Sequence, residues 1–166
     1  MRAAERPLLD ELASIGIEID TVWDLYKIPE ARERAVPVLL RHLARDYPDR
    51  VLEAIGHSLD GSFVRPWWAE LRAVYLRTDR DVVRDRLANA LASCATKAHY
   101  DDLLDFVADA SLGPSRIYFL RPINRIGNRI SAGRGRSVVA SHVEDPVLGR
   151  EAVAILKARN RSKQTS

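Results

Sequence analysis

The chain has 166 residues, of which 46% are hydrophobic and 30% charged, a composition typical of a folded domain with a core rather than of a disordered segment. Its one cysteine, Cys94, excludes an internal disulfide framework, and no stretch approaches the ~20 consecutive apolar residues of a membrane-spanning helix. The first residues carry Glu5, Asp10 and Glu11 without a long apolar run, so we expect no secretory signal. These features favour a cytoplasmic protein with no membrane association.

Charge is distributed unevenly along the chain. Residues 1–114 hold 15 Lys and Arg against 20 Asp and Glu, a net charge of −5, whereas residues 115–166 hold 11 against 3, a net charge of +8. A basic C-terminal part is consistent with an anionic partner, and equally with a tail that keeps the protein soluble.

An N-terminal helical cap is predicted in residues 7–28. Pro7 favours the start of a first helix, and Gly16 favours its end because glycine readily adopts the left-handed conformation found just after helices. A second short helix is expected to follow from Asp20 or Thr21, both good N-cap residues.

Four pairs of amphipathic helices are predicted after the cap. In the first pair, apolar residues recur every three or four positions on both sides of the turn Asp46-Tyr47-Pro48. One such hairpin cannot bury its own apolar face, so neighbouring hairpins are expected to cover it. The expected pairs are about 34–60, 65–95, 100–127 and 136–159, followed by a polar tail, 161–166.

Two sets of positions share one repeat length. The second helices begin near positions that are 32, 34 and 32 residues apart, namely Pro48, Arg80, Pro114 and Pro146. Their core positions are 32, 33 and 32 residues apart, namely Ile55, Leu87, Leu120 and Ala152. A period of this length is typical of stacked helical hairpins.

The second helix of the second pair has a recognisable pattern of residues: Asp79, Val82, Val83, Arg84, Leu87, Ala88, Ala90 and Leu91. With this pattern, residues 34–158 resemble HEAT repeats. Residues 144–156 look like the same motif, and residues 113–126 resemble the second helix of short bacterial HEAT-like proteins. The resemblance implies an all-α fold: a right-handed superhelical solenoid of about four hairpins with an N-terminal cap, forming one domain over residues 1–160. It does not specify a function, because one fold hosts many tasks.

Sites for catalysis or metal binding are weakly indicated. Asp101, Asp102 and Asp105 resemble the DDxxD pattern that holds magnesium in prenyl-transferring enzymes, but acidic residues are also favoured in the first turn of any helix. Cys94 and His99 are too few ligands for zinc, which takes three or four from the protein. We therefore expect no metal, no cofactor and no catalytic activity.

The third pair's second helix and the Gly- and Arg-rich segment 127–136, predicted as a polar loop, hold the strongest candidates for partner binding. Second helices line the concave face of HEAT-like stacks, so arginines there would present a positive groove. Pro122 is expected to kink this helix, and Asn124 occupies a position where other pairs have leucine. The partner-binding candidates are Arg121, Asn124, Arg125, Arg129, Arg134, Arg136 and, as a separate anchor, Trp67.

Two further expectations concern residues with structural roles. Arg84 and Arg116 are expected to bridge to the turn aspartate of a neighbouring repeat. Trp67 and Trp68 are adjacent on one helix, so one of the two is expected to lie outside the core.

The sequence therefore predicts a non-catalytic scaffold or adaptor that binds a macromolecular partner, with a protein favoured, on its concave face. Nucleic-acid binding through the basic C-terminal repeats is the alternative, and an enzyme on a HEAT-like scaffold is a weaker one. The oligomeric state and the identity of the partner stay open.

Overall fold

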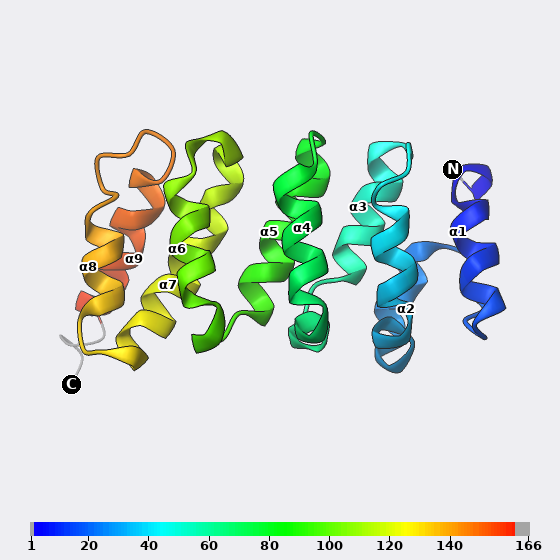
Figure 1. Ribbon diagram of the computed structural model, residues 1–166, viewed down its shortest axis with the longest axis horizontal. Coiled ribbons are helices and arrows are strands. Elements are labelled where there is room, and N and C mark those ends of the chain that lie inside the picture. The colour runs from blue at the N-terminus through cyan, green and yellow to red at the C-terminus, as the bar shows by residue number, and fades with distance from the viewer. Residues whose placement is uncertain (1, 162–166) are drawn as a thin grey trace. The chain divides into compact units, whose positions relative to one another are not determined.

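The computed structural model describes residues 2–161, and throughout this range α-helices and short 3-10 helices alternate with turns, without any strand (Figure 1). The all-α prediction is confirmed. The chain divides into two compact units, Met1–Cys94 (unit 1) and Ala95–Ser166 (unit 2), while the single domain over residues 1–160 stays a prediction. No helix within the described range is both long enough and apolar enough to cross a membrane.

Unit 1 contains both the predicted cap and the first two pairs. Its elements, in chain order, are α1 Arg2–Ser14, η1 Val22–Lys27, α2 Pro29–His42, α3 Asp49–Ser58, η2 Ser62–Trp67, α4 Trp68–Arg77 and α5 Asp81–Cys94. Helix α1 packs on α2, α3 packs on both η1 and α5, and α4 packs on α5. Within this unit α2 and α4 form one layer, and α3 and α5 lie behind them (Figure 1).

Two helices of unit 1 begin at residues other than those predicted, and each of them contains a proline near its start. Helix α1 already begins at Arg2 and runs through Pro7, so Pro7 does not open it. Pro29 is the first residue of α2, which therefore begins before the predicted residue 34. A fixed φ near −65° suits a proline to this first helical position. Gly16 ends α1 as predicted, with φ +77.

Polar contacts between the two hairpins of unit 1 follow the predicted repeat length. Arg86 pairs with Glu53, and the hydroxyl of Ser93 donates to Asp60 Oδ1 at 2.6 Å. Arg80 donates to the carbonyl oxygen of Tyr47 at 3.3 Å. Each of these three contacts joins residues 33 apart in sequence, so equivalent positions in and beside α3 and α5 lie close to each other.

Unit 2 contains the third and fourth predicted pairs. Its elements are η3 Lys97–His99, α6 Tyr100–Ala108, η4 Ala110–Arg116, α7 Ile117–Ile130, α8 Arg134–Ala140 and α9 Gly149–Arg161. Helix α7 packs against α6, α8 and α9. It runs through Pro122 as one helix, and the expected kink there stays a prediction. The proline lies in the second turn, where it removes a single backbone hydrogen bond.

The predicted polar loop at residues 127–136 is wrong. Helix α7 continues to Ile130, and α8 begins at Arg134, which leaves only 131–133 between them. The third pair therefore ends later than residue 127, and the fourth begins earlier than residue 136. Two of the three glycines in this segment, Gly127 and Gly135, lie in helices and permit close packing of α7 and α8. Gly133, with φ +80, lies in the turn between the two helices.

Gly127 and Gly135 form the contact between α7 and α8. A Cβ atom on Gly127 would lie 2.6 Å from the Cα of Gly135 and would also collide with the hydroxyl of Tyr100. A Cβ atom on Gly135 would lie 2.6 Å from the carbonyl oxygen of Ile123 and would collide with that of Asn124. Neither position admits a side chain, so these two glycines allow the helices to pack closely and do not form a turn.

The predicted tail, 161–166, begins with the last residue of α9, Arg161. Residues 162–166 lie outside the described residues.

The close α7–α8 contact leads us to predict the effect of a substitution on the stability of the fold. Gly135→Ala should lower the free energy of unfolding by about 1–3 kcal/mol, because the added methyl group must push two backbone carbonyls apart. Urea unfolding measures this change. Ser137→Ala, at an exposed position of the same helix, is the control and should stay within about 0.5 kcal/mol of the unsubstituted protein. Equal stability of the two variants would contradict the close contact.

Candidate functional site

Three arginines form a row along the exposed side of α7. Arg121, Arg125 and Arg129, called here the arginine row, are spaced four residues apart and are all exposed. Residues at this spacing lie on one face of an α-helix, and the row spans about 12 Å at 1.5 Å per residue. The sequence of α7 contains no acidic residue. The row is therefore a continuous positive stripe.

Only one member of the row has a charged partner among the described residues. Arg121 Nε lies 2.7 Å from Glu151 Oε1 of α9, and 70% of the Arg121 side chain is exposed. Arg125 and Arg129 make no hydrogen bond or ion pair with the described part of the chain. Two exposed guanidinium groups thus keep their full charge and all their donors for a ligand.

Arg121 is larger and more exposed than the residues at the equivalent position of the first two pairs. In the repeat register its counterparts are Gly56 and Ala88, which follow the core positions Ile55 and Leu87 and are buried. A Cβ atom on Gly56 would lie 2.9 Å from Cγ of Arg86, so a small residue is required there for α3 and α5 to pack. At the same register position α7 carries a long, exposed cation.

Tyr118 extends the row and was missed by sequence reasoning. It precedes Arg121 by three residues, which places it on the same face of α7, and 36% of it is exposed. The spacing alone could have found it, but a tyrosine at a helix start is more often part of the core.

Asn124 does not belong to the row. It is half-buried, and its Oδ1 accepts a hydrogen bond from Asn128 Nδ2 at 2.9 Å. The Oδ1 of Asn128 accepts in turn from the backbone N–H of Arg136 at 3.3 Å. This chain of amides joins α7 to the first turn of α8, so the polar residue at a leucine position serves the same helix contact as the two glycines.

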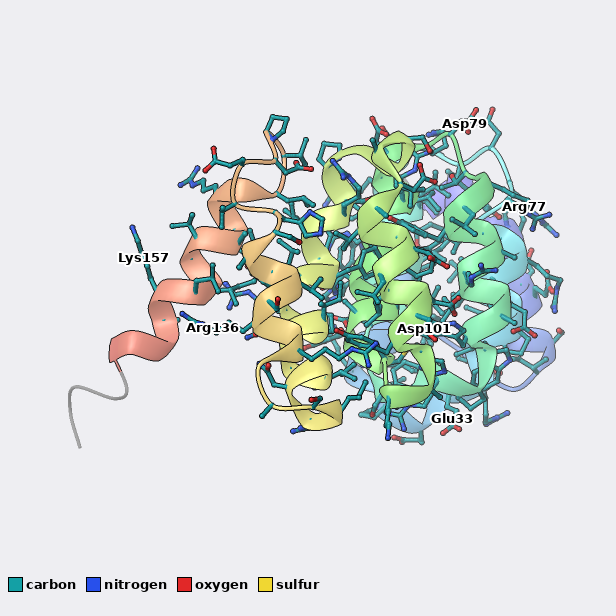
Figure 2. All side chains as sticks on the ribbon, turned by 60° about the vertical axis from the view of Figure 1, so that its left-hand side comes forward. Glu33, Arg77, Asp79, Asp101, Arg136 and Lys157 are labelled. Carbon is teal, nitrogen blue, oxygen red and sulfur yellow. The ribbon has the colours of Figure 1, made fainter. Side chains whose placement is uncertain are left out.

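The two arginines predicted on a loop lie on α8, and their side chains are engaged. The guanidinium of Arg134 lies 5.0 Å from the centre of the Tyr100 ring, a cation–π distance. Arg136 Nη1 donates to the carbonyl oxygen of Leu156 at 3.4 Å, so this side chain extends towards α9. Figure 2 shows Arg136 beside α9, whereas Lys157 projects away from that helix. The structure does not align Arg134 and Arg136 with the row.

Trp67 lies in unit 1, at the end of η2, and is half-buried, whereas its neighbour Trp68 is buried. The expectation that one of the two tryptophans lies outside the core is confirmed.

Arg116 has the structural role that the sequence predicts, and Arg84 does not. Arg116 is 6% exposed, donates to the carbonyl oxygen of Val107 at 3.0 Å, and lies 3.5 Å from Asp145, which precedes α9. Arg84 instead pairs with Asp81 of its own helix at 3.2 Å. In unit 1 the contact to the preceding turn comes from Arg80, which lies 3.3 Å from Asp46. Arg80, four positions before Arg84 and directly before the first residue of α5, therefore makes the contact that was predicted for Arg84.

The residues considered for metal binding are not gathered. Among the described residues no three His, Cys, Asp or Glu side chains are placed to hold a metal ion. Asp101 and Asp105 are exposed on α6, and Nδ1 of His99 accepts from the N–H of Thr96 at 3.2 Å. Cys94 is fully buried, and burial raises the pKa of its thiol from 9.0 to about 11. A thiol with such a pKa is a poor nucleophile near neutral pH.

A buried histidine links the cap to the first pair in unit 1. His42 is fully buried; its Nε2 lies 2.7 Å from Glu11 of α1, and its Nδ1 lies 2.7 Å from the hydroxyl of Tyr47. Hydrogen bonds from Arg41 and then His42 lower the pKa of Glu11 from 4.5 to about 2. Although the order Glu–His–hydroxyl resembles a catalytic relay, Tyr47 is only 7% exposed and its hydroxyl is used by His42. The arrangement fixes α1 on α2.

Comparison with protein-family models, curated proteins and solved structures finds no match for this chain. The described part of the chain is all-helical and presents an exposed row of arginines, two of which have no side-chain partner there.

The buried cysteine makes a prediction about reactivity. In the native protein at pH 8, a thiol-specific reagent such as dithiobis-nitrobenzoate should label Cys94 far more slowly than it labels a free thiol. Both the burial and the raised pKa of the thiol oppose attack. Absorbance of the released product follows the reaction, and denaturant should restore rapid labelling. Rapid labelling without denaturant would contradict this placement of Cys94.

The Glu11 contacts make a prediction about pH. Since the pKa of Glu11 is lower in the folded state, its stabilising contribution is complete above about pH 4.5 and is lost as pH falls towards 2. The difference in melting temperature between the unsubstituted protein and Glu11→Gln should therefore be largest above pH 4.5 and shrink on acidification. Glu33→Gln, at an exposed carboxylate of α2, is the control and should show a small difference at every pH. A pH-independent difference for Glu11→Gln would contradict the prediction.

Proposed function

We propose that the protein is a non-catalytic scaffold that binds an anionic macromolecular partner through the arginine row. One observation carries the proposal: the exposed side chains of Arg125 and Arg129 have no partner within residues 2–161, on a helix that has no acidic residue. Folded proteins usually balance exposed charges with nearby charges of opposite sign. A row in which only Arg121 has an acidic partner among the described residues is therefore suited to an external anion.

The scaffold in this proposal is a right-handed solenoid of about four HEAT-like hairpins, with α1 and η1 as the N-terminal cap. The contacts at a separation of 33 residues between the two hairpins of unit 1 support this architecture. In such a stack α7 is a second helix, so the row would line the concave face. The cytoplasmic location expected from the composition belongs to the same proposal.

A binding role without catalysis is supported by the state of the candidate reactive groups. The Cys94 thiol is buried with a raised pKa, and His42 is enclosed between Glu11 and Tyr47. Arg125 and Arg129, by contrast, are exposed and have no side-chain partner among the described residues, and a guanidinium group is suited to binding an anion.

The proposal is tested by charge reversal with a matched control. On a heparin column, a generic polyanion, Arg125→Glu with Arg129→Glu should elute at clearly lower salt than the unsubstituted protein. The control, Arg50→Glu with Arg77→Glu, changes the net charge equally at exposed positions of unit 1 and should elute close to the unsubstituted protein. Circular dichroism checks that both variants fold. Equal elution of the two variants would show that net charge alone governs binding, and would overturn the proposed site.

A further inference from the structure

We infer that the anionic partner of the arginine row is a single-stranded nucleic acid, bound through its phosphates on Arg125 and Arg129 and through a base stacked on Tyr118. This inference rests on the proposed function and names the chemistry of the partner at the same site. It is carried by the composition of the exposed surface of unit 2, by the type of cation in the row and by the exposed tyrosine at its end.

The exposed surface of unit 2 does not suit a protein partner. Protein interfaces have a desolvated apolar core surrounded by a polar rim. Within the described part of unit 2, Tyr118 is the one large hydrophobic side chain that is exposed. Exposed ion pairs contribute little each, and a few of them do not offset the loss of translational and rotational freedom on association. A protein docked on the row alone would be held weakly.

A nucleic acid differs because its phosphates carry condensed counterions. Each cation that replaces a counterion releases it, which drives binding by entropy without any apolar contact. Unit 2 as a whole carries 12 Lys and Arg against 7 Asp and Glu, a net charge of +5. The row consists of arginine alone, and guanidinium binds phosphate in a bidentate manner and stays charged at any physiological pH.

Exposed cations beside the row extend its positive field. Arg150 and Lys157 are exposed on α9, the helix that α7 contacts and that supplies Glu151 to Arg121. Lys157 projects into open space in Figure 2. Among the described residues, the one member of the row that Glu151 pairs with is Arg121.

Tyr118 selects a single strand over a duplex. Its position three residues before Arg121 places its ring about 16 Å from Arg129 along the helix axis, in line with the row. Bases of a duplex are stacked on one another, whereas those of a single strand can stack on an exposed aromatic side chain. An aromatic ring next to a line of cations is the arrangement by which sequence-tolerant single-strand binding is achieved.

The experiment measures binding of the full chain to fluorescein-labelled oligonucleotides by anisotropy. The probes are deoxythymidine and uridine oligomers of about 20 nucleotides, long enough to span the row, and a duplex of the same length. Single strands should bind in about 50 mM salt, with similar affinity for the deoxyribose and ribose forms, and more tightly than the duplex. The logarithm of the association constant should fall linearly with the logarithm of salt concentration.

Two variants and one control separate the contributions. Arg125→Ala with Arg129→Ala should weaken single-strand binding and reduce the salt slope by about 1.4, at about 0.7 per phosphate lost. Tyr118→Ala should weaken it about tenfold with little change in the salt slope, because stacking releases no counterions. Arg50→Ala with Arg77→Ala should change neither quantity. Circular dichroism confirms that each variant is folded.

Defined outcomes overturn the inference. It fails if single strands do not bind in about 50 mM salt, if the double arginine variant binds them equally, or if the duplex binds as tightly and Tyr118→Ala has no effect. A labelled polyglutamate is the competing probe. If polyglutamate binding requires Arg125 and Arg129 while oligonucleotide binding does not, the partner is an acidic protein. In that case this inference is overturned and the proposed function stands. If neither polymer depends on the row and the heparin result is also negative, both are overturned.

Discussion

The position of α7 depends on the contact between two glycines. Gly127 and Gly135 let the backbones of α7 and α8 approach until no side chain fits between them, and the amides of Asn124 and Asn128 tie the same contact with hydrogen bonds. One side of α7 packs against α8 in this contact, and other sides pack against α6 and α9. The remaining side of α7 is therefore exposed. The arginine row lies there, so its direction follows from backbone packing and not from the arginines themselves.

The two units hold their helices together in different ways. In unit 1 the equivalent helices α3 and α5 pack closely over Gly56, and polar contacts join positions one repeat apart. In unit 2 the corresponding position is Arg121, and its contact with α9 is an exposed ion pair to Glu151. An exposed pair stabilises little, so an ionic contact of this kind is replaceable by a ligand at small cost. The departure from the repeat thus makes part of the surface available without disturbing the core.

The fold class and the repeat length could be predicted from the sequence because both depend on apolar periodicity, which local residues display directly. The first and last residues of the helices were harder to predict from the sequence. Proline and glycine each have several structural uses, and composition does not tell them apart: Pro7 lies inside α1, Pro29 starts α2, and Gly127 and Gly135 pack helices where a loop was expected. The candidate arginines were found by charge, but only side-chain contacts separate the free Arg125 and Arg129 from the engaged Arg134 and Arg136.

The acidic residues of the DDxxD segment affect the charge distribution of the hairpin that α6 and α7 form. Asp101 and Asp105 are exposed on α6, which has no basic residue, while every charged residue of α7 is a cation. The hairpin therefore has an electric dipole moment directed from one helix to the other. In the field of a polyanion such a body experiences a torque that turns α7 towards the polymer and α6 away from it before contact. The aspartates would then contribute to the orientation and speed of encounter although they touch no ligand.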